Sequence, residues 1–283
     1  MEPHARSATP VTRPSTPRVG VLAGLLVTWS VAWSAPLYSL SWDTKYDLVL
    51  DPWGLLRRAL HLWDPQNTWG GLSNQGYGYL FPMGPFFAVG SEVAPAWLVQ
   101  RVWWTVLLTV GFIGALGLLR ALDVGSQTSR VVGAMAWVLA PKVVSSIGVL
   151  SSEVQPQLLC PLILWPIVLG WQRRLSARRA STLSGLAVLA CGGVNATATV
   201  VALLPTALFL VTRTGWWRDR LTWGWIVAVL AATSWWLGPL ILMGRYAPPF
   251  LSWIETARIV AEPITLLDVF RGTTNWVGPL LTP

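Results

Sequence analysis

Long apolar runs separated by short loops constrain this chain more than any other feature. A helix that crosses a membrane needs about 20 mainly apolar residues, and runs near that length lie at 19–40, 98–119, 131–150, 156–171 and 221–243. The run from 181 to 211 is too long for one crossing. The stretch "GGVNATA" at 192–198 suits a turn between helices at about 181–193 and 196–211. Because only 11% of residues are charged, we predict an all-α polytopic membrane protein with seven membrane helices, the fifth and sixth forming a short hairpin.

Basic residues are concentrated on alternate loops, as in membrane proteins whose cytoplasmic loops are basic. With an inside N-terminus, the inner segments carry Arg6, Arg13, Arg18, Arg120, Arg130, Arg173, Arg174, Arg178, Arg179, Arg213, Arg218 and Arg220 against Glu2, Asp123 and Asp219. The outer segments carry Asp43, Asp47, Asp51, Asp64, Glu92, Glu153, Glu255, Glu262 and Asp268 against Lys45, Arg57, Arg58, Arg101, Arg245, Arg258 and Arg271. The net charge of +8 is therefore interpreted as a topology signal and not as a nucleic-acid surface.

The ends of the chain set the predicted domain limits. Residues 1–18 are rich in Pro, Ser, Thr and Arg and are predicted to be a disordered cytoplasmic tail. The run at 19–40 is longer than the apolar core of a signal peptide, so we interpret it as a retained anchor helix. The remaining residues, 19–283, form the predicted membrane domain.

A long outer loop, residues 41–97, follows the first run and has structure of its own. Asp51 before Pro52 predicts a helix cap with proline at the first helical position. The following "WGLLRRALHLWDP" predicts an interfacial helix with an apolar stripe formed by Leu56, Ala59, Leu60 and Trp63. Residues 76–90, "GYGYLFPMGPFFAVG", are too apolar for an exposed loop, and we predict a re-entrant or interface-buried segment.

Two acidic sites begin where predicted helices leave the outer surface. One is "WDTKYD" with Asp43, Lys45 and Asp47, and the other is Glu255 after the last run. A carboxylate beside a cation suits a transferase with a lipid-phosphate-linked sugar donor, because the carboxylate can take a proton from the acceptor hydroxyl and the cation can offset the departing phosphate. The same charges would also simply mark the outer boundary of a helix. Lys142, inside the third run, either faces a protein-lined cavity or extends to the interface.

Three stretches carry a family resemblance: "WDTKYDLVLDPWGLLRRALHLWDP", "GGLSNQGYGYLFPMGPFF" and "WLVQRVWW". They resemble the N-terminal part of the actinobacterial alpha-(1->3)-arabinofuranosyltransferases of the AftD type, which are membrane glycosyltransferases of the GT-C superfamily. A looser likeness continues from "SSEVQPQLLCPLILWPIVLG" to "SWIETARI". The resemblance implies a GT-C helix bundle with its active site on the outer face of the plasma membrane.

The resemblance also implies a reaction and its residues. Members transfer arabinofuranose, with inversion, from decaprenyl-phosphoryl-arabinofuranose to the arabinan of arabinogalactan and lipoarabinomannan. Asp43 and Glu255 would be the catalytic carboxylates, Lys45 and Arg258 would bind the donor phosphate, and Asp47 would be a candidate metal or acceptor ligand. The family proteins are several times longer, so we expect this chain to be truncated at its C-terminus and to lack part of the donor site, which would leave the fragment alone inactive.

Other functional classes are weighed against the enzyme. No P-loop, dinucleotide fingerprint or zinc-protease motif is present, and no resident cofactor is predicted, although a divalent cation at Asp43, Asp47 or Glu255 stays open. Cys160 and Cys191 lie in apolar runs and predict neither a disulfide framework nor a redox pair. A polytopic lipid or sugar transporter is the main alternative, with Lys142 in its favour, and a non-catalytic cell-envelope scaffold is the third.

Overall fold

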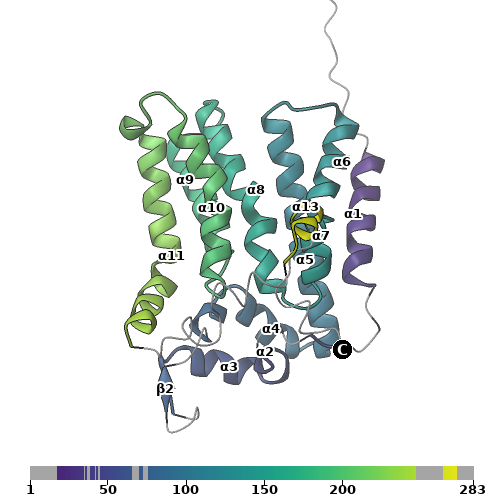
Figure 1. The fold of residues 1–283 in the computed structure, drawn as a ribbon, viewed down its shortest axis with the longest axis vertical. Helices are drawn as coiled ribbons and strands as arrows, with labels where there is room; N and C mark the ends of the chain where they lie inside the picture. Colours follow the sequence, from purple (N-terminus) through teal and green to yellow (C-terminus); the bar gives the residue numbers. More distant parts are fainter. Residues whose placement is uncertain are drawn as a thin grey trace, which may run out of the picture.

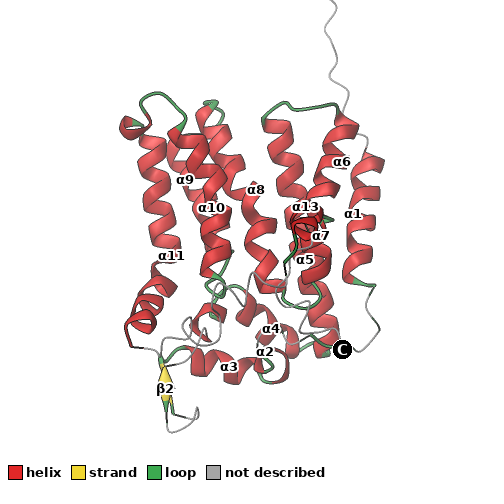
Figure 2. Cartoon of the chain, in the orientation of Figure 1, coloured by secondary structure: helices red, strands yellow, loops and turns green. Residues whose placement is uncertain are grey.

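The structure is a computed structural model that describes residues 18–34, 36, 39–41, 43, 45–65, 70–72, 76–246 and 264–272. Long helices run side by side as a bundle, and shorter elements form a layer across one end (Figures 1 and 2). The bundle consists of α1 (Arg18–Ala32), α5 (Ala96–Ala121), α6 (Gln127–Val138), α7 (Pro141–Ser146), α8 (Ser151–Trp171), α9 (Ala177–Leu189), α10 (Ala196–Val211) and α11 (Arg220–Tyr246). The predicted all-α bundle is confirmed for these residues.

The layer across one end, called the loop layer, is the predicted outer loop. It contains α2 (Asp47–Leu50), α3 (Pro52–Ala59), β1 (Trp63–Asp64), β2 (Gly71–Leu72), the 3-10 helix η1 (Gly76–Tyr79) and α4 (Met83–Ser91). The two short strands pair antiparallel, with Trp63 opposite Leu72. A second 3-10 helix, η2 (Trp216–Arg218), and a last short helix, α13 (Leu266–Arg271), complete the described elements.

Three helices in the described part of the chain are long and apolar enough to cross a membrane: α5, α8 and α11. The helices α1 and α10 are apolar but shorter; the 15 residues of α1 extend for about 22 Å, less than the ~30 Å of a hydrocarbon core. Each predicted run does form helix, whereas the count of seven membrane crossings stays a prediction.

Several predicted helix boundaries are wrong. The helix in the run at 19–40 ends at Ala32, and α9 spans Ala177–Leu189 where 181–193 was predicted. The run at 131–150 forms two helices, because Pro141 has no N–H to continue α6 and instead occupies the first turn of α7. The helix predicted at 156–171 starts five residues earlier, at Ser151, because the Asp43 carboxylate accepts from the first N–H groups of α8. The predicted tail before Arg18 lies outside the described residues.

The helix α5 packs against α1, α6 and α8, and its glycines allow close packing against α8. Gly111, Gly114 and Gly117 recur every three residues and so share one face. A Cβ atom at these positions would lie within 2.6 to 2.9 Å of Leu158, Leu162 and Trp165 of α8, respectively. On its other side α5 meets α1, where the indole of Trp29 donates to Thr109 Oγ1 at 2.7 Å. In a bilayer the hydrophobic effect does not drive helices to associate, because lipid tails are as apolar as the side chains. Close packing at small residues and interhelical hydrogen bonds stabilise the association instead.

The predicted hairpin forms, but α10 packs mainly on α8, and α9 packs on both α8 and α11. The turn between α9 and α10 contains Gly192 at φ +74°, a conformation that glycine adopts without strain. Asn195 then caps α10, its side-chain oxygen accepting from the Ala198 N–H at 2.9 Å.

The segments predicted to share a side lie at the same end of the bundle. The start of α1 and the connections α5–α6, α8–α9 and α10–α11 lie opposite the loop layer (Figure 1). We call this the arginine end, and its described basic residues are Arg18, Arg120, Arg130, Arg173, Arg174, Arg178, Arg179, Arg213, Arg218 and Arg220. The opposite end, with the loop layer, is the loop end. Which end faces the cytoplasm stays a prediction.

The predicted interfacial helix is partly right. Asp51 caps α3 as expected, its carboxylate accepting from the Gly54 N–H at 2.9 Å. The helix ends at Ala59, however, because the chain then turns into the β1–β2 pair. Leu60 and Trp63 are therefore off the helix and exposed, and the single apolar stripe is wrong. The buried face of α3 consists of Pro52, Gly54, Leu55 and Ala59 and packs on α4 and η1.

Most of residues 76–90 pack against the protein as expected, in η1 and α4, although Phe81 and Val89 are exposed. Tyr79 and Met83 are almost completely buried in the hydrophobic core at the loop end. The segment lies across the end of the bundle (Figure 2). This supports the interface-buried alternative, in which protein contacts satisfy the irregular backbone.

Candidate active site at the start of α8

The Asp43 side chain lies at the N-terminus of α8 and is 1% exposed. Its carboxylate accepts from the backbone N–H groups of Ser151 and Ser152, both at 3.1 Å. It also accepts from both serine hydroxyls, that of Ser152 at 2.7 Å and that of Ser151 at a shorter distance. Four donors from one helix end therefore surround a single carboxylate that lies 108 residues away in the sequence.

This contact explains why α8 begins at Ser151. Leu150, at the cap position, offers no side-chain hydrogen bond, so the first N–H groups of the helix need an acceptor from elsewhere. Asp43 supplies it, and its negative charge is favoured at the positive end of the helix dipole. We call Asp43, Ser151, Ser152 and Tyr79 the Asp43 network, because the Tyr79 hydroxyl donates to the Asp43 carbonyl oxygen at 2.6 Å.

Burial and hydrogen bonding act in opposite directions on the Asp43 carboxyl. Its pKa is raised above the usual value because burial removes the carboxylate from water, while the bonds from Ser151 and Ser152 partly offset the rise. The backbone of Asp43 has φ +41°, in the left-handed region that costs an ordinary residue about 1 kcal/mol or more. A buried carboxylate held on a strained backbone is typical of a functional position.

The chain before Asp43 is fixed by two buried polar residues of α5. Gln100 forms two hydrogen bonds with the Ser41 backbone, at 2.9 and 2.6 Å. Arg101 donates to the Pro36 carbonyl oxygen at 3.0 Å and to the Ser39 hydroxyl at 2.9 Å. Sequence reasoning missed both residues; the available signal was the pair "QR" within an apolar helix, where polar groups need partners.

The tip of the α9–α10 turn joins the loop layer beside the Asp43 network. The Gly193 N–H donates to the Gly78 carbonyl oxygen at 3.2 Å, and the side chain of Gln155 donates to the Ala190 carbonyl oxygen at 2.6 Å. A Cβ atom on Gly78 would lie 2.6 Å from backbone atoms of Gly193. The start of α8, the turn and η1 therefore form a continuous contact around Asp43.

The other charges of "WDTKYDLVLDP" have different partners. Lys45 is half-buried and forms no ion pair with any residue in the described ranges. Asp47 is exposed and pairs with Arg58 at 2.6 Å, and Asp51 lies 3.6 Å from the same guanidinium. Exposed pairs of this kind contribute little stability, so Asp47 mainly orients α2 on α3.

A second charged pair lies next to the network and was not predicted as a site. Lys142, at the start of α7, pairs with Glu153 of α8 at 2.8 Å. The side chains are 24% and 17% exposed, and Glu153 Oε2 is buried without a hydrogen bond to the described residues. The pair gives Lys142 a partner within the protein, while the choice between a protein-lined cavity and the interface stays open. The signal in the sequence was the acidic residue following two serines at the end of a loop.

Glu255 and Arg258 lie outside the described residues, so their predicted roles as second carboxylate and donor-phosphate ligand stay predictions. Within the described ranges no three His, Cys, Asp or Glu side chains gather as metal ligands. Asp43 and Asp47, the candidate ligands that the structure describes, have Ser151, Ser152 and Arg58 as partners. The chemistry that these groups can perform without a metal is proton transfer and charge compensation.

Comparison with known proteins covers nearly the whole chain. Residues 27–282 match the family model described as "Alpha-(1->3)-arabinofuranosyltransferase, N-terminal GT-C domain". An alpha-(1->3)-arabinofuranosyltransferase of Mycobacterium tuberculosis is 40% identical over 281 residues, which are 97% of this chain and 19% of that protein. The protein of that name from Mycolicibacterium smegmatis is 39% identical over 248 residues, 86% of this chain and 17% of that protein.

Solved structures give the same answer for the fold. The cryo-EM structure of the arabinofuranosyltransferase AftD from mycobacteria superposes with a TM-score of 0.81 at 36% identity, covering 93% of this chain and 20% of that chain. A mutant form gives a TM-score of 0.78 at 37% identity and covers 88% of this chain. The chain thus spans about a fifth of the length of the relatives that it matches.

Proposed function

Because the chain belongs to the N-terminal GT-C domain family of the alpha-(1->3)-arabinofuranosyltransferases, we propose that it is the catalytic membrane part of such an enzyme. The proposed donor is decaprenyl-phosphoryl-arabinofuranose, and the proposed acceptor is the arabinan of arabinogalactan or lipoarabinomannan. Transfer proceeds with inversion at the loop end, which faces the outside of the plasma membrane. The arginine end then faces the cytoplasm, in agreement with the positive-inside rule.

The proposed reaction needs one base and one cationic site. Asp43 takes the proton from the acceptor hydroxyl, the acceptor oxygen attacks the anomeric carbon, and the bond from that carbon to the lipid phosphate breaks. The phosphate leaves with the electron pair. Lys45 and Arg258 offset its charge, and Glu255 is the second carboxylate of the site.

The observation that carries the proposal is the buried Asp43 carboxylate at the N-terminus of α8. Burial raises its pKa, which makes it a stronger base than an exposed aspartate once it is ionised. Among the described residues, its four hydrogen-bond donors come from Ser151 and Ser152. An acceptor hydroxyl therefore reaches it by replacing a serine hydroxyl, which has the same donor chemistry.

A transfer assay with a lipid-linked donor tests the function. Because the fragment alone is expected to be inactive, membranes containing a full-length enzyme with this chain as its N-terminal region are incubated with radiolabelled decaprenyl-phosphoryl-arabinofuranose and an arabinan oligosaccharide, and the linkage of the product is determined. We expect an α-(1→3)-linked arabinofuranose. Movement of the donor across vesicles without a new linkage would instead identify a transporter, and neither transfer nor transport would favour a scaffold.

The proposed binding of the donor phosphate by Lys45 can be tested against a control residue at the same end of the bundle. Lys45→Gln is expected to raise the KM for the donor about tenfold, the loss of one charge-assisted contact. Arg57, exposed on α3, makes no contact with the network, and Arg57→Gln is expected to leave the KM unchanged. Equal effects of the two substitutions would contradict a specific role for Lys45.

A further inference from the structure

A slot of about 350 Å³ opens at the arginine end, far from the Asp43 network. Its walls are apolar: Val21 comes from α1, Ile113 and Leu116 from α5, and Trp165 and Leu169 from α8. The helix α5 packs against both α1 and α8, so the slot lies between these two helices with α5 as its floor. An opening between helices of a membrane bundle faces the acyl chains of the bilayer.

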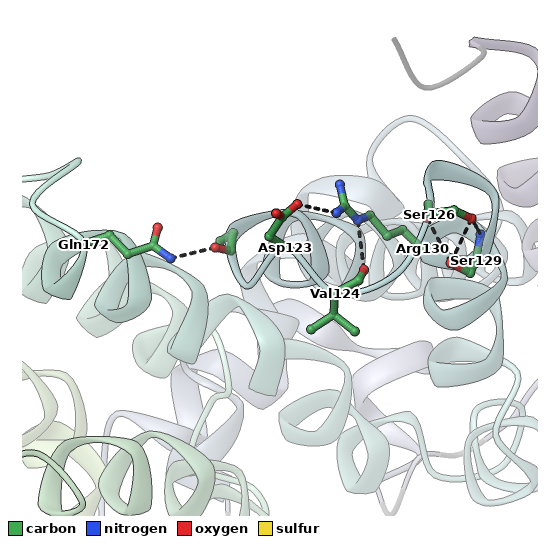
Figure 3. Close-up of polar contacts among 7 residues, drawn as sticks. Asp123, Val124, Ser126, Ser129, Arg130 and Gln172 are labelled. Carbon is green, nitrogen blue, oxygen red and sulfur yellow. Dashed lines mark hydrogen bonds and ion pairs between the residues drawn. The ribbon is translucent and has the colours of Figure 1, made fainter. Parts of the chain in front are cut away.

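Trp165 limits the depth of the slot. Its ring lies over Gly117, only 2.6 Å from where a Cβ atom would be, so α8 closes directly onto α5 at this point. Toward the arginine end the two helices are joined again, because the Gln172 side chain donates to the Ala121 carbonyl oxygen at 2.7 Å (Figure 3). The slot is therefore fixed on two sides by contacts between α5 and α8.

The mouth of the slot is basic. Arg120, in the last turn of α5, and Arg174, just after α8, both line it and are exposed. Of the two described acidic residues at this end, Asp123 pairs with Arg130 at 2.6 Å (Figure 3). Asp219 lies in the α10–α11 connection and does not line the slot. The charge at the mouth is thus positive, while the interior is apolar.

We propose that this slot binds an anionic phospholipid of the leaflet at the arginine end. One acyl chain lies against the apolar walls, and the headgroup phosphate lies between Arg120 and Arg174. Basic pockets between membrane helices bind anionic headgroups in this manner, and the volume falls within the range of small-molecule sites. A free phosphate would leave the apolar walls unused. The inference does not depend on the proposed transfer reaction.

Lipid binding to the purified chain tests the proposal. The chain is kept in a neutral detergent, and the binding of phosphatidylglycerol and of phosphatidylcholine with identical acyl chains is measured by native mass spectrometry. We expect phosphatidylglycerol to bind at least tenfold more tightly. Arg120→Gln and Arg174→Gln are each expected to weaken phosphatidylglycerol binding roughly fivefold, with little effect on phosphatidylcholine.

Two controls separate the slot from general attraction to a basic surface. Arg178 and Arg179 are exposed at the same end, on α9, and do not line the slot. The double variant Arg178→Gln with Arg179→Gln is therefore expected to change phosphatidylglycerol affinity less than twofold. Leu169→Trp, which fills the slot, is expected to remove binding of both lipids, with folding checked by thermal unfolding.

Three results would overturn the proposal. Equal affinity for the two lipids would remove the role of the arginines. An equal loss of phosphatidylglycerol affinity in the Arg178 and Arg179 double variant would show that general surface charge, and not the slot, attracts the lipid. Displacement of the lipid by millimolar glycerol 3-phosphate would show a phosphate site without an acyl-chain site.

Discussion

At the scale of single residues, the Asp43 carboxylate both caps the start of α8 and is a candidate base. Its four hydrogen bonds fix the start of α8, and its burial raises the carboxyl pKa. The sequence predicted Asp43 as a candidate from a charge cluster and a family resemblance. It could not predict the partners, because Ser151 and Ser152 are brought to Asp43 only by the packing of α8 on α5.

Removing one serine hydroxyl should change the pH dependence of transfer. The Ser152 hydroxyl lowers the Asp43 pKa, so Ser152→Ala raises it further. A base works only when ionised, and activity is lost as the pH falls through its pKa. We therefore expect the acidic limb of the pH–rate profile to move to higher pH. Ser91→Ala, at an exposed serine of α4, is the control, and an unmoved limb would argue against Asp43 as the base.

The Lys142–Glu153 pair offers a second residue-scale test. Both side chains are largely buried, so Glu153→Gln removes the carboxylate that lies 2.8 Å from the Lys142 ammonium group and is expected to cost about 1–3 kcal/mol of unfolding free energy. The double variant Lys142→Met with Glu153→Gln removes that charge and should recover most of the loss. A double-mutant cycle on thermal or denaturant unfolding in detergent measures the coupling. Additive losses would mean that the pair contributes nothing.

At the scale of elements, the sequence predicted helices well and their ends poorly. Apolar length found every bundle helix, but the starts of α7 and α8 depend on Pro141 and on the distant Asp43. The end of α3 depends on the strand pairing of Trp63 with Leu72. Hydropathy contains no information about such contacts, which explains why the predicted stripe through Leu60 and Trp63 failed.

Gly78 is the most sensitive contact between the loop layer and the bundle. A Cβ atom there would meet the backbone of Gly193 and Val194 at 2.6 and 2.7 Å, and backbone cannot move aside as a side-chain tip can. Gly78→Ala is expected to lower the unfolding free energy by about 1–3 kcal/mol and to reduce transfer, since Tyr79 next to it holds the Asp43 carbonyl oxygen.

The matched control for Gly78 is Gly238 in α11, where a Cβ atom would meet nothing within 4 Å. Gly238→Ala should be neutral or slightly stabilising, because alanine favours helix over glycine. Thermal unfolding of the two variants in the same detergent makes the comparison. Equal melting temperatures would show that the α9–α10 turn leaves room for a Cβ atom at Gly78 of η1.

At the scale of the whole molecule, charge separates the two ends of the bundle. The basic residues of the alternate connections gather at the arginine end, and the acidic loop layer covers the other (Figure 1). The alternation of basic and acidic segments along the sequence was enough to predict this grouping. The absolute orientation rests on the positive-inside rule and is open to direct measurement.

Cysteine labelling in intact cells measures the orientation. Cys160 and Cys191 are buried and should not react with a membrane-impermeant maleimide. Glu92→Cys, next to α4 at the loop end, is expected to be labelled from outside, and Arg178→Cys, at the arginine end, only after permeabilisation. The reverse pattern would place the Asp43 network on the cytoplasmic side and contradict transfer at the outer face.

The most direct test of the central claim measures transfer and folding together in Asp43→Asn. Asparagine keeps one acceptor oxygen, enough for the donors of one of the two serines, while its NH2 group faces the other serine; it cannot take a proton from an acceptor hydroxyl. We predict that the variant inserts and folds, with an unfolding free energy lower by about 1–3 kcal/mol because one serine loses its acceptor, while transfer from decaprenyl-phosphoryl-arabinofuranose falls by about a hundredfold or more. A folded variant that retains transfer within about tenfold of the parent would show that Asp43 only anchors α8.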